Sequence, residues 1–365
     1  MTPLPRLALR TIALAGAIAV SALASALPAR AEAIVTLASI ASHYNVFILG
    51  NMGSAASPYT SDSEGPMAVG GDLYLQDFTT AATSTNGGPA LVVGGNMTET
   101  RGTINGNVFI GGNANFTTNA GGTTVNGNLD VLGTLVSAPT QVTGTTKTGV
   151  AAAPLPINFQ TIGNDLKAAS LALTTTAYTS QGATGTVVLN NHQLTLTGAG
   201  SGLNFFTVTA AQMAQLGSGS LTINLPAGAT AIINVSGQAV TVGNPGNFGF
   251  FFNGVTSDHV IFNFYEATSL SMQSFSGSIL APLATVSFTN GQLIGSLTAG
   301  ALSSTLYQNG EFHNVLFSGS LPTPVTETST AVPEPATLTL FAAACLLLLW
   351  SLAAHRPRRA GPSPL

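Results

Sequence analysis

Four carboxylates near the start of the chain are the best candidates for a chemical site. Asp62, Glu64, Asp72 and Asp77 fall within sixteen residues, among glycines. Carboxylates on flexible loops supply the hard oxygen ligands that Ca²⁺ prefers. Their spacing matches neither an EF-hand nor the regular repeat of a calcium-binding β-roll. The sequence leaves two interpretations open: a calcium site, or solvated turn residues in which Asp62 and Glu64 cap backbone amides.

The histidines do not have the spacing of a metal or catalytic motif. His43, His192, His259 and His313 are scattered, and no His-x-x-x-His pair places two rings on one helix face. Glu311 and His313 are two residues apart and lie on the same side of a strand, so we expect them to form a structural hydrogen-bonded pair.

No catalytic residue is predicted. Enzymes that cleave polysaccharides on a β-helix combine a carboxylate cluster with a basic side chain, but Arg101, Lys147 and Lys167 each stand alone in the sequence. The run 217–220, Gly-Ser-Gly-Ser, lacks the strand-to-helix context of a nucleophilic serine. The sequence therefore favours a protein that is not an enzyme.

The composition excludes several classes of protein. Asp, Glu, Lys and Arg make up 6% of the 365 residues, and 45% are hydrophobic. A disordered charged tail or a coiled coil would need far more charge, and nine Lys and Arg are too few and too dispersed to bind nucleic acid. Between residues 32 and 331 there are twelve carboxylates and three cations, a net charge of −9. This acidic body lies between two basic, apolar ends.

The N-terminal end has the pattern of a secretory signal peptide over residues 1–31. Arg6 and Arg10 precede an uncharged apolar run, and Ala29 and Ala31 form a small-x-small site for signal peptidase. Export leads to an oxidising space, yet the single Cys345 has no partner for an internal disulfide.

The C-terminal end has the pattern of a membrane-sorting segment over residues 333–359. Pro333, Glu334 and Pro335 precede the uncharged stretch 336–354, which as a helix is about 28 Å long and could cross a membrane. Arg356, Arg358 and Arg359 would remain in the cytoplasm. A plain tail anchor is the alternative. Residues 320–332 are rich in Pro, Thr and Ser and predict a spacer.

The Pro-Glu-Pro tripeptide, the uncharged stretch 336–354 and the terminal arginines, in this order, resemble the PEP-CTERM sorting signal of Gram-negative bacteria. The resemblance implies an exosortase as processing partner, membrane contact before processing, and a cell surface or extracellular matrix rich in exopolysaccharide.

The body predicts an all-β fold of stacked coils. Short apolar segments alternate with Gly-Gly-Asn or Gly-Asn, as at 69–73, 93–97, 104–108, 110–114 and 125–129. Such short strands cannot bury a face alone, so we expect a β-helix with Val, Ile and Leu inside, Thr, Ser and Asn outside, and Gly and Asn in tight or left-handed corners. Similar phrases after residue 277 predict further turns of the same solenoid. A β-sandwich is the alternative.

Two helices are predicted within this body. Apolar residues recur at three- and four-residue steps from Pro156 to Leu173, which indicates one amphipathic helix that flanks the solenoid and covers its core. A second, short helix is predicted from Ala210 to Leu216, with Thr209 as its N-cap.

Further phrases resemble the choice-of-anchor A family of bacterial surface domains. They are found at 44–51, 61–65, 69–72, 232–237, 261–264, 277–282 and 311–314, and they span about residues 38–319. The resemblance implies an adhesive β-helical domain over residues 32–319, similar in plan to bacterial ice-binding adhesins, with no catalytic motif. We expect the ligand to be extracellular polysaccharide or another extended polymer.

Two other functions stay open, ice binding and a purely structural role in a biofilm matrix. Ice binding would use paired threonines such as those at 79–80, 117–118 and 123–124, but regular Thr-x-Thr ranks are not visible in the sequence.

Overall fold

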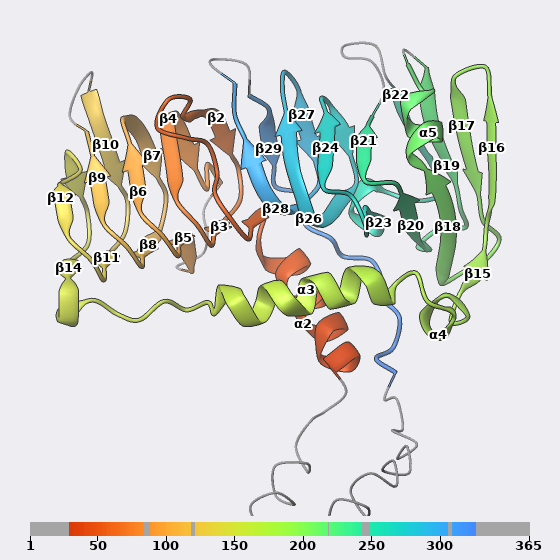
Figure 1. The fold of residues 1–365 in the computed structure, drawn as a ribbon, viewed down its shortest axis with the longest axis horizontal. Helices are drawn as coiled ribbons and strands as arrows, with labels where there is room; N and C mark the ends of the chain where they lie inside the picture. The colour runs from red at the N-terminus through yellow and green to blue at the C-terminus, as the bar shows by residue number, and fades with distance from the viewer. Residues whose placement is uncertain are drawn as a thin grey trace, which may run out of the picture. The chain divides into compact units, whose positions relative to one another are not determined.

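The chain folds into a solenoid of short strands stacked in parallel (Figure 1). The computed structural model describes residues 29–83, 88–117, 121–217, 219–242, 249–305 and 309–325. Within these ranges every strand pair is parallel except the hairpin formed by β16 and β17. The predicted all-β solenoid is confirmed, and the β-sandwich is not the fold.

Each coil contributes strands to three faces. The first, here called the helix-covered face, runs the length of the solenoid. Its strands are, in spatial order, β14 (Thr146–Thr148), β11 (Leu129–Val131), β8 (Asn107–Ile110), β5 (Pro89–Val93), β3 (Met67–Val69), β1 (Val46–Ile48), β28 (Leu297–Ser303), β26 (Ser278–Phe288), β23 (Val260–Asn263), β20 (Thr230–Ser236), β18 (Leu203–Thr209) and β15 (Ala183–Thr184).

The second face is reached where long strands bend round a corner. In β4 (Leu73–Thr80), residues 73–75 pair with β6 on this face, while residues 78–80 pair with β7 on the third face. The last residues of β26 and β28 also belong to the second face. Its other strands are β12 (Leu135–Ser137), β9 (Ala114–Phe116), β6 (Met97–Glu99), β24 (Ser269–Met272) and β21 (Ala239–Thr241).

The third face completes each coil. Its strands are β13 (Gln141–Val142), β10 (Gly122–Val125), β7 (Arg101–Ile104), the end of β4, β2 (Tyr59–Ser63), β29 (Glu311–His313), β27 (Gln292–Ile294) and β25 (Phe275–Ser276). A separate four-stranded sheet comprises β16 (Thr186–Asn190), β17 (Gln193–Thr197), β19 (Ser220–Asn224) and β22 (Gly249–Asn253). In their coils, β19 and β22 occupy the chain position that third-face strands have in the other coils, directly before the next strand of the helix-covered face.

The chain does not wind from one end of the solenoid to the other. It starts in the middle at β1, which pairs with β3 on one side and with β28 on the other. The first coils proceed outward to β14. Helix α3 (Phe159–Ala172) then carries the chain back along the solenoid, and the remaining coils return from β15 to the middle (Figure 1). We call the place where the two arms meet, between β1 and β28 and between β2 and β29, the seam.

The repeated Gly-Gly-Asn phrase forms a stacked corner between the first two faces. The Oδ1 atom of each Asn or Asp accepts a hydrogen bond from a backbone amide of the next coil. This ladder runs from Asn51 to Asp72, Asn96, Asn113 and Thr134, with N···O distances of 2.7–2.9 Å. The repeat in the sequence is therefore a repeat of hydrogen bonds between coils.

The glycines at these corners are required for close approach. A Cβ on Gly70, Gly94 or Gly111 would lie 2.3–2.4 Å from the carbonyl oxygen of the preceding coil. None of the three has a positive φ. Of the two kinds of corner that were expected, tight and left-handed, these positions are tight, because what excludes a side chain there is the spacing between stacked backbones.

Helices form a second hydrophobic layer on the helix-covered face. Helix α3 confirms the prediction for 156–173, although it begins at Phe159, where Asn158 caps the helix by accepting a hydrogen bond from the Thr161 amide. Leu166 and Ala169 of α3 are buried against outward-facing apolar residues of the strands, among them Phe47, Ala68, Val92, Ile232 and Ile261. Where the helices cover this face, the expectation of outward Thr, Ser and Asn was wrong, since the sheet is buried there on both sides.

One flanking helix was predicted, but a second long helix packs across α3 (Figure 1). Helix α2 (Ala29–His43) buries Ala33, Ile34, Leu37, Ile40 and Ala41, a helical spacing, in the same layer. The predicted short helix is confirmed as α5 (Ala210–Ala214), with a full capping box between Thr209 and Gln212. A fourth helix, α4 (Thr176–Thr179), is a single turn, and 3₁₀ turns cover 149–151 and 257–259. No described helix is both long and apolar enough to span a membrane.

The end of the described chain lies against the helices. The Phe317 amide donates to the carbonyl of Ala41 at 3.1 Å, and the Thr323 amide donates to Gln181 Oε1 at 2.7 Å. Residues 320–325, the start of the predicted spacer, therefore have defined contacts.

Candidate functional site

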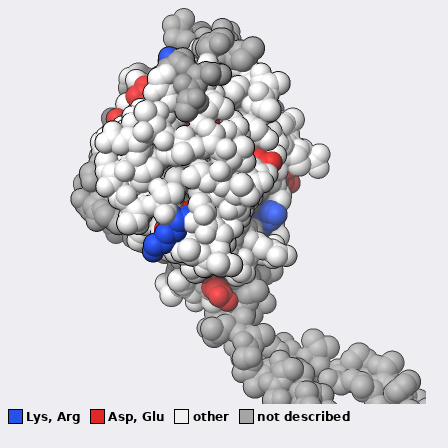
Figure 2. Space-filling model, turned by 90° about the vertical axis from the view of Figure 1, so that its left-hand side faces the viewer, with Lys and Arg blue, Asp and Glu red and all other residues white. Residues whose placement is uncertain are grey.

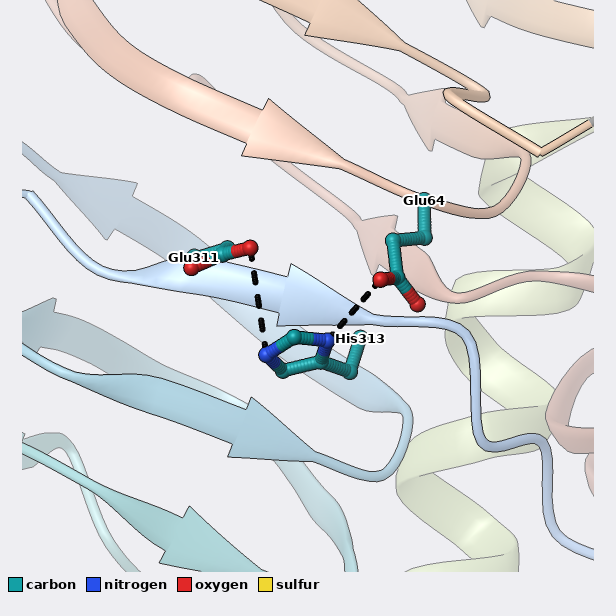
Figure 3. Close-up of side chains that lie close together, drawn as sticks. All are labelled: Glu64, Glu311 and His313. Carbon is teal, nitrogen blue, oxygen red and sulfur yellow. Dashed lines mark hydrogen bonds and ion pairs between the residues drawn. The ribbon is translucent and has the colours of Figure 1, made fainter.

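A histidine at the seam lies between two carboxylates (Figure 3). Ser63 of β2 pairs with Phe312 of β29, so Glu64 comes beside His313. His313 Nδ1 is 2.9 Å from Glu64 Oε1, and His313 Nε2 is 3.8 Å from Glu311 Oε1. One oxygen from each glutamate and one ring nitrogen lie within 4.8 Å of one another. We call Glu64, Glu311 and His313 the seam cluster.

The predicted hydrogen bond between Glu311 and His313 was wrong. At 3.8 Å the two atoms are too far apart, and the ring is hydrogen-bonded to Glu64 instead. The hydrogen-bond partner of His313 is therefore Glu64, 249 residues away in the chain, and not Glu311 in the same strand.

The protonation of the neighbouring carboxyls reflects their surroundings. The backbone amide of Asn314 donates to Glu64 Oε2 at 2.9 Å and, with His313, lowers the pKa of Glu64. Burial, followed by the nearby charges of Glu311 and Glu64, raises the pKa of Asp62. Negative charge is therefore concentrated at the seam.

The four carboxylates predicted as calcium ligands have different partners. Asp62 and Glu64 lie at the seam. Asp72 Oδ1 accepts from the backbone and side-chain nitrogens of Asn96 at 2.7 and 3.1 Å, and Asp77 forms an ion pair with Arg101. Glu64 caps a backbone amide, as the second interpretation expected, and calcium binding stays a prediction.

The residues of the predicted targeting segments are placed as follows. Ala29 and Ala31 lie in the first turn of α2. Cys345, the stretch 336–354 and the sorting-signal residues lie outside the described residues. The latter are Pro333, Glu334, Pro335, Arg356, Arg358 and Arg359.

Two ranks of small side chains run along the second face. In β21, β24, β26 and β28 the segment on this face reads small-apolar-small, with the apolar residue buried and the small residues outward. Paired registers align Ala239, Ser269, Thr285 and Ala301 in one rank, and Thr241, Ser271, Ser287 and Ser303 in the other. We call these eight residues the small-residue face. They carry no charge, and successive members of one rank, which lie on neighbouring strands, are about 4.8 Å apart.

The small-residue face could have been found in the sequence, but not with a Thr-x-Thr search. Its signal is a small residue on each side of Val240, Leu270, Val286 and Leu302. Of the threonine pairs that suggested ice binding, Thr80 and Thr123 are fully buried, whereas their neighbours Thr79 and Thr124 are partly exposed and align through Thr103 on the third face. In a strand one member of each adjacent pair must point inward.

A second uncharged surface is the outer side of the four-stranded sheet. Phe251, Thr222 and Thr195 share one rank, and the side chain of Phe251 is 56% exposed. Beside them, Asn253 donates to Asn224 at 2.7 Å, and this amide row continues to Thr197. The polar side chains of this row thus hydrogen-bond to one another within the sheet.

Charged side chains are few on the surface as well as in the sequence. Figure 2 views the molecule from the end where β12 and β14 lie, and shows isolated blue and red groups on an otherwise uncharged surface. A surface of this kind does not attract a polyanion by charge.

A family model described as "Putative Ice-binding-like adhesive domain" matches residues 37–314. The chain belongs to this family. The match covers all coils of the solenoid, including the strands on both sides of the seam. A sequence search of curated proteins gave no significant match.

Two solved structures are similar to this adhesive domain. One is an ice-binding protein from an Antarctic biological consortium, at 14% identity and a TM-score of 0.34, over 74% of this chain and 87% of that chain. The other is a domain of ice-binding protein 1 from Shewanella frigidimarina, at 14% identity and a TM-score of 0.37, over 76% of this chain and 95% of that chain.

Proposed function

We propose that the chain is an exported surface adhesin whose small-residue face binds a neutral, extended polymer, with extracellular polysaccharide as the first candidate. The observation that carries the proposal is the pair of ranks formed by β21, β24, β26 and β28. They offer hydroxyl groups on a flat, uncharged sheet, in a family of adhesive domains.

The chemistry of this face suits a neutral sugar polymer. Ser271, Ser287 and Thr241 can donate to and accept from sugar hydroxyls, and the methyl and methylene groups between them contact the apolar faces of sugar rings. The ranks repeat from coil to coil, so an extended ligand can make the same contact several times. Many weak contacts of this kind add up through multivalency.

Binding is expected to be almost independent of salt, because no charge contributes to it. We expect the affinity of the full chain for a neutral glucan, or for neutral exopolysaccharide of its host, to change less than about twofold between low and high NaCl. The measurement is a co-sedimentation assay, with anionic alginate in parallel. Binding only to alginate, a steep loss with salt, or binding to no neutral polymer would contradict the proposal.

Ice is the second candidate ligand, favoured by the same two ranks of small hydroxyl side chains. Thermal hysteresis in a solution of the full chain, together with no affinity for neutral polysaccharide, would favour ice over a sugar polymer. A structural role in the matrix is what remains if neither ligand binds.

The finer account of export is also a proposal: signal peptidase removes residues 1–31, and an exosortase of a Gram-negative host processes the PEP-CTERM signal of a choice-of-anchor A protein. The buried apolar residues of α2 begin at Ala33, so a chain that starts at Glu32 keeps all of them. We expect the intact mass of the protein from its host to correspond to a species from Glu32 to near Pro335. A mass that still includes Trp350 and the terminal arginines would mean a plain membrane anchor.

A further inference from the structure

The seam cluster has hydrogen bonds that determine which ring nitrogen of His313 carries the proton. Glu64 Oε1 lies 2.9 Å from His313 Nδ1, and its other oxygen accepts from the Asn314 amide. An ionised carboxylate can only accept, so Nδ1 must donate. In a neutral imidazole the lone pair is then on Nε2.

The lone pair on His313 Nε2 faces a carboxylate oxygen of Glu311, which is also an acceptor. Glu311 Oε1 lies 3.8 Å from His313 Nε2, on the side of the ring away from Glu64 (Figure 3). Two acceptors that face each other repel unless a positive charge lies between them. The distance exceeds that of a hydrogen bond and is close to the roughly 3.3–3.6 Å that separates two ligand atoms of a tetrahedral Zn²⁺ ion with bonds of about 2.0–2.2 Å.

The protein supplies no other cation at this place. Among the described residues, the ion pairs of Glu64 and Glu311 are with His313 alone. The Gln292 amide is 3.5 Å from Glu311 Oε2 and carries no charge, while Asp62 adds a further carboxylate nearby. The side chains of His313, Glu64 and Glu311 are 25%, 32% and 33% exposed, so an ion and its waters can reach them.

We propose that His313 Nε2 and Glu311 Oε1 bind a divalent transition metal ion such as Zn²⁺, with Glu64 as the outer carboxylate that orients the ring. Imidazole with carboxylate suits Zn²⁺ and its neighbours, whereas Ca²⁺ takes oxygen ligands. A carboxylate that accepts from the far nitrogen of a metal-binding histidine is a recurrent arrangement. Water would fill the remaining positions.

A metal ion here would act on the junction of the two arms. β29 is the last strand of the returning arm, and Glu64 directly follows β2 in the first coil. An ion held by His313 and Glu311 fixes the ring on which Glu64 depends, and so stabilises the contact that closes the seam. The site is separate from the small-residue face and does not depend on the proposed ligand.

The test is titration of the full chain, prepared without a histidine tag, with ZnCl₂ in a calorimeter. We expect one ion per chain and a rise in the melting temperature. His313→Gln and Glu311→Gln should each weaken binding at least about tenfold, and Glu64→Gln should weaken it about tenfold through the ring orientation. His259→Gln is the matched control, because His259 also lies beside a carboxylate, with 3.2 Å between Nδ1 and Asp258 Oδ1.

Co²⁺ gives a readout that does not require a folded variant. The visible absorption of Co²⁺ bound to the unmodified chain should show one nitrogen-containing site that Zn²⁺ displaces. Absence of saturable one-to-one binding, or equal binding by the unmodified chain, His313→Gln and Glu311→Gln, would overturn the proposal.

Discussion

Replacing Gly94 with alanine is expected to lower the free energy of unfolding by about 3 kcal/mol, because the stacked corner leaves no room for a methyl group. The added Cβ would lie 2.3 Å from the carbonyl oxygen of Gly70 and 3.0 Å from its carbonyl carbon. Both are backbone atoms, and Gly70 is itself confined by the carbonyl of Leu49. The strain cannot be relieved by a side-chain rotation, so neighbouring coils must separate.

Gly202→Ala is the control for this experiment. No heavy atom lies within 4 Å of the position where its Cβ would be placed, and its backbone does not have a positive φ. We expect little change in the urea midpoint for Gly202→Ala and a large decrease for Gly94→Ala. Equal effects of the two substitutions would mean that the corner is not close-packed.

Replacing Glu99 with glutamine is expected to remove a pH dependence of several kcal/mol from the stability of the first arm. Glu99 is fully buried, and neither carboxyl oxygen has a hydrogen bond of normal geometry among the described residues. Burial raises the pKa of this carboxyl from 4.5 to about 8, and the neighbouring Thr123 hydroxyl offsets only part of the effect. Because Gly102 has no side chain, there is room beside it for the Glu99 carboxyl group.

The sign of the pH effect follows from this raised pKa. The folded state holds the proton more tightly than the unfolded state, so the group favours folding most below pH 4.5 and progressively less as the pH rises towards 8. Because of the raised pKa of Glu99, the free energy of unfolding of the unmodified chain should fall by about 3 kcal/mol between pH 5 and pH 8.

Urea unfolding at several pH values measures the difference between the two chains. Glu99→Gln should show a flatter profile and should be more stable than the unmodified chain at pH 8, while the exposed Glu32→Gln should follow the unmodified chain. Parallel profiles for the Glu99→Gln and unmodified chains would show that the Glu99 carboxyl is ionised in the fold.

The sequence predicted those parts of the fold that depend on neighbours in the chain. The Gly-Gly-Asn phrase indicated stacked coils because each coil repeats the same corner, and the apolar stripe from Phe159 to Leu173 indicated α3 because its period is 3.6. Helix α2 was missed, since its alanine-rich sequence was interpreted as the end of a signal peptide and the beginning of the domain.

The seam could not be predicted in the same way. It depends on β1 pairing with β28, a contact between residues about 250 positions apart that no local pattern specifies. For this reason Glu64 was grouped with Asp72 and Asp77, its neighbours in the sequence, and His313 was paired with Glu311. The small-residue face was missed for a related reason, because its ranks become regular only when four coils are set in register.

The most direct test of the account is whether a bulky charge on the small-residue face abolishes adhesion. Ser271 lies in the middle of its rank and is exposed, and Thr222 is the matched outward residue on the four-stranded sheet. Affinity for the neutral polysaccharide that the unmodified chain binds would be measured for Ser271→Arg and Thr222→Arg. The account predicts at least a tenfold loss for Ser271→Arg and less than a twofold change for Thr222→Arg, by analogy with the roughly 1–2 kcal/mol cost of disrupting a central contact. Unchanged binding by Ser271→Arg would contradict it.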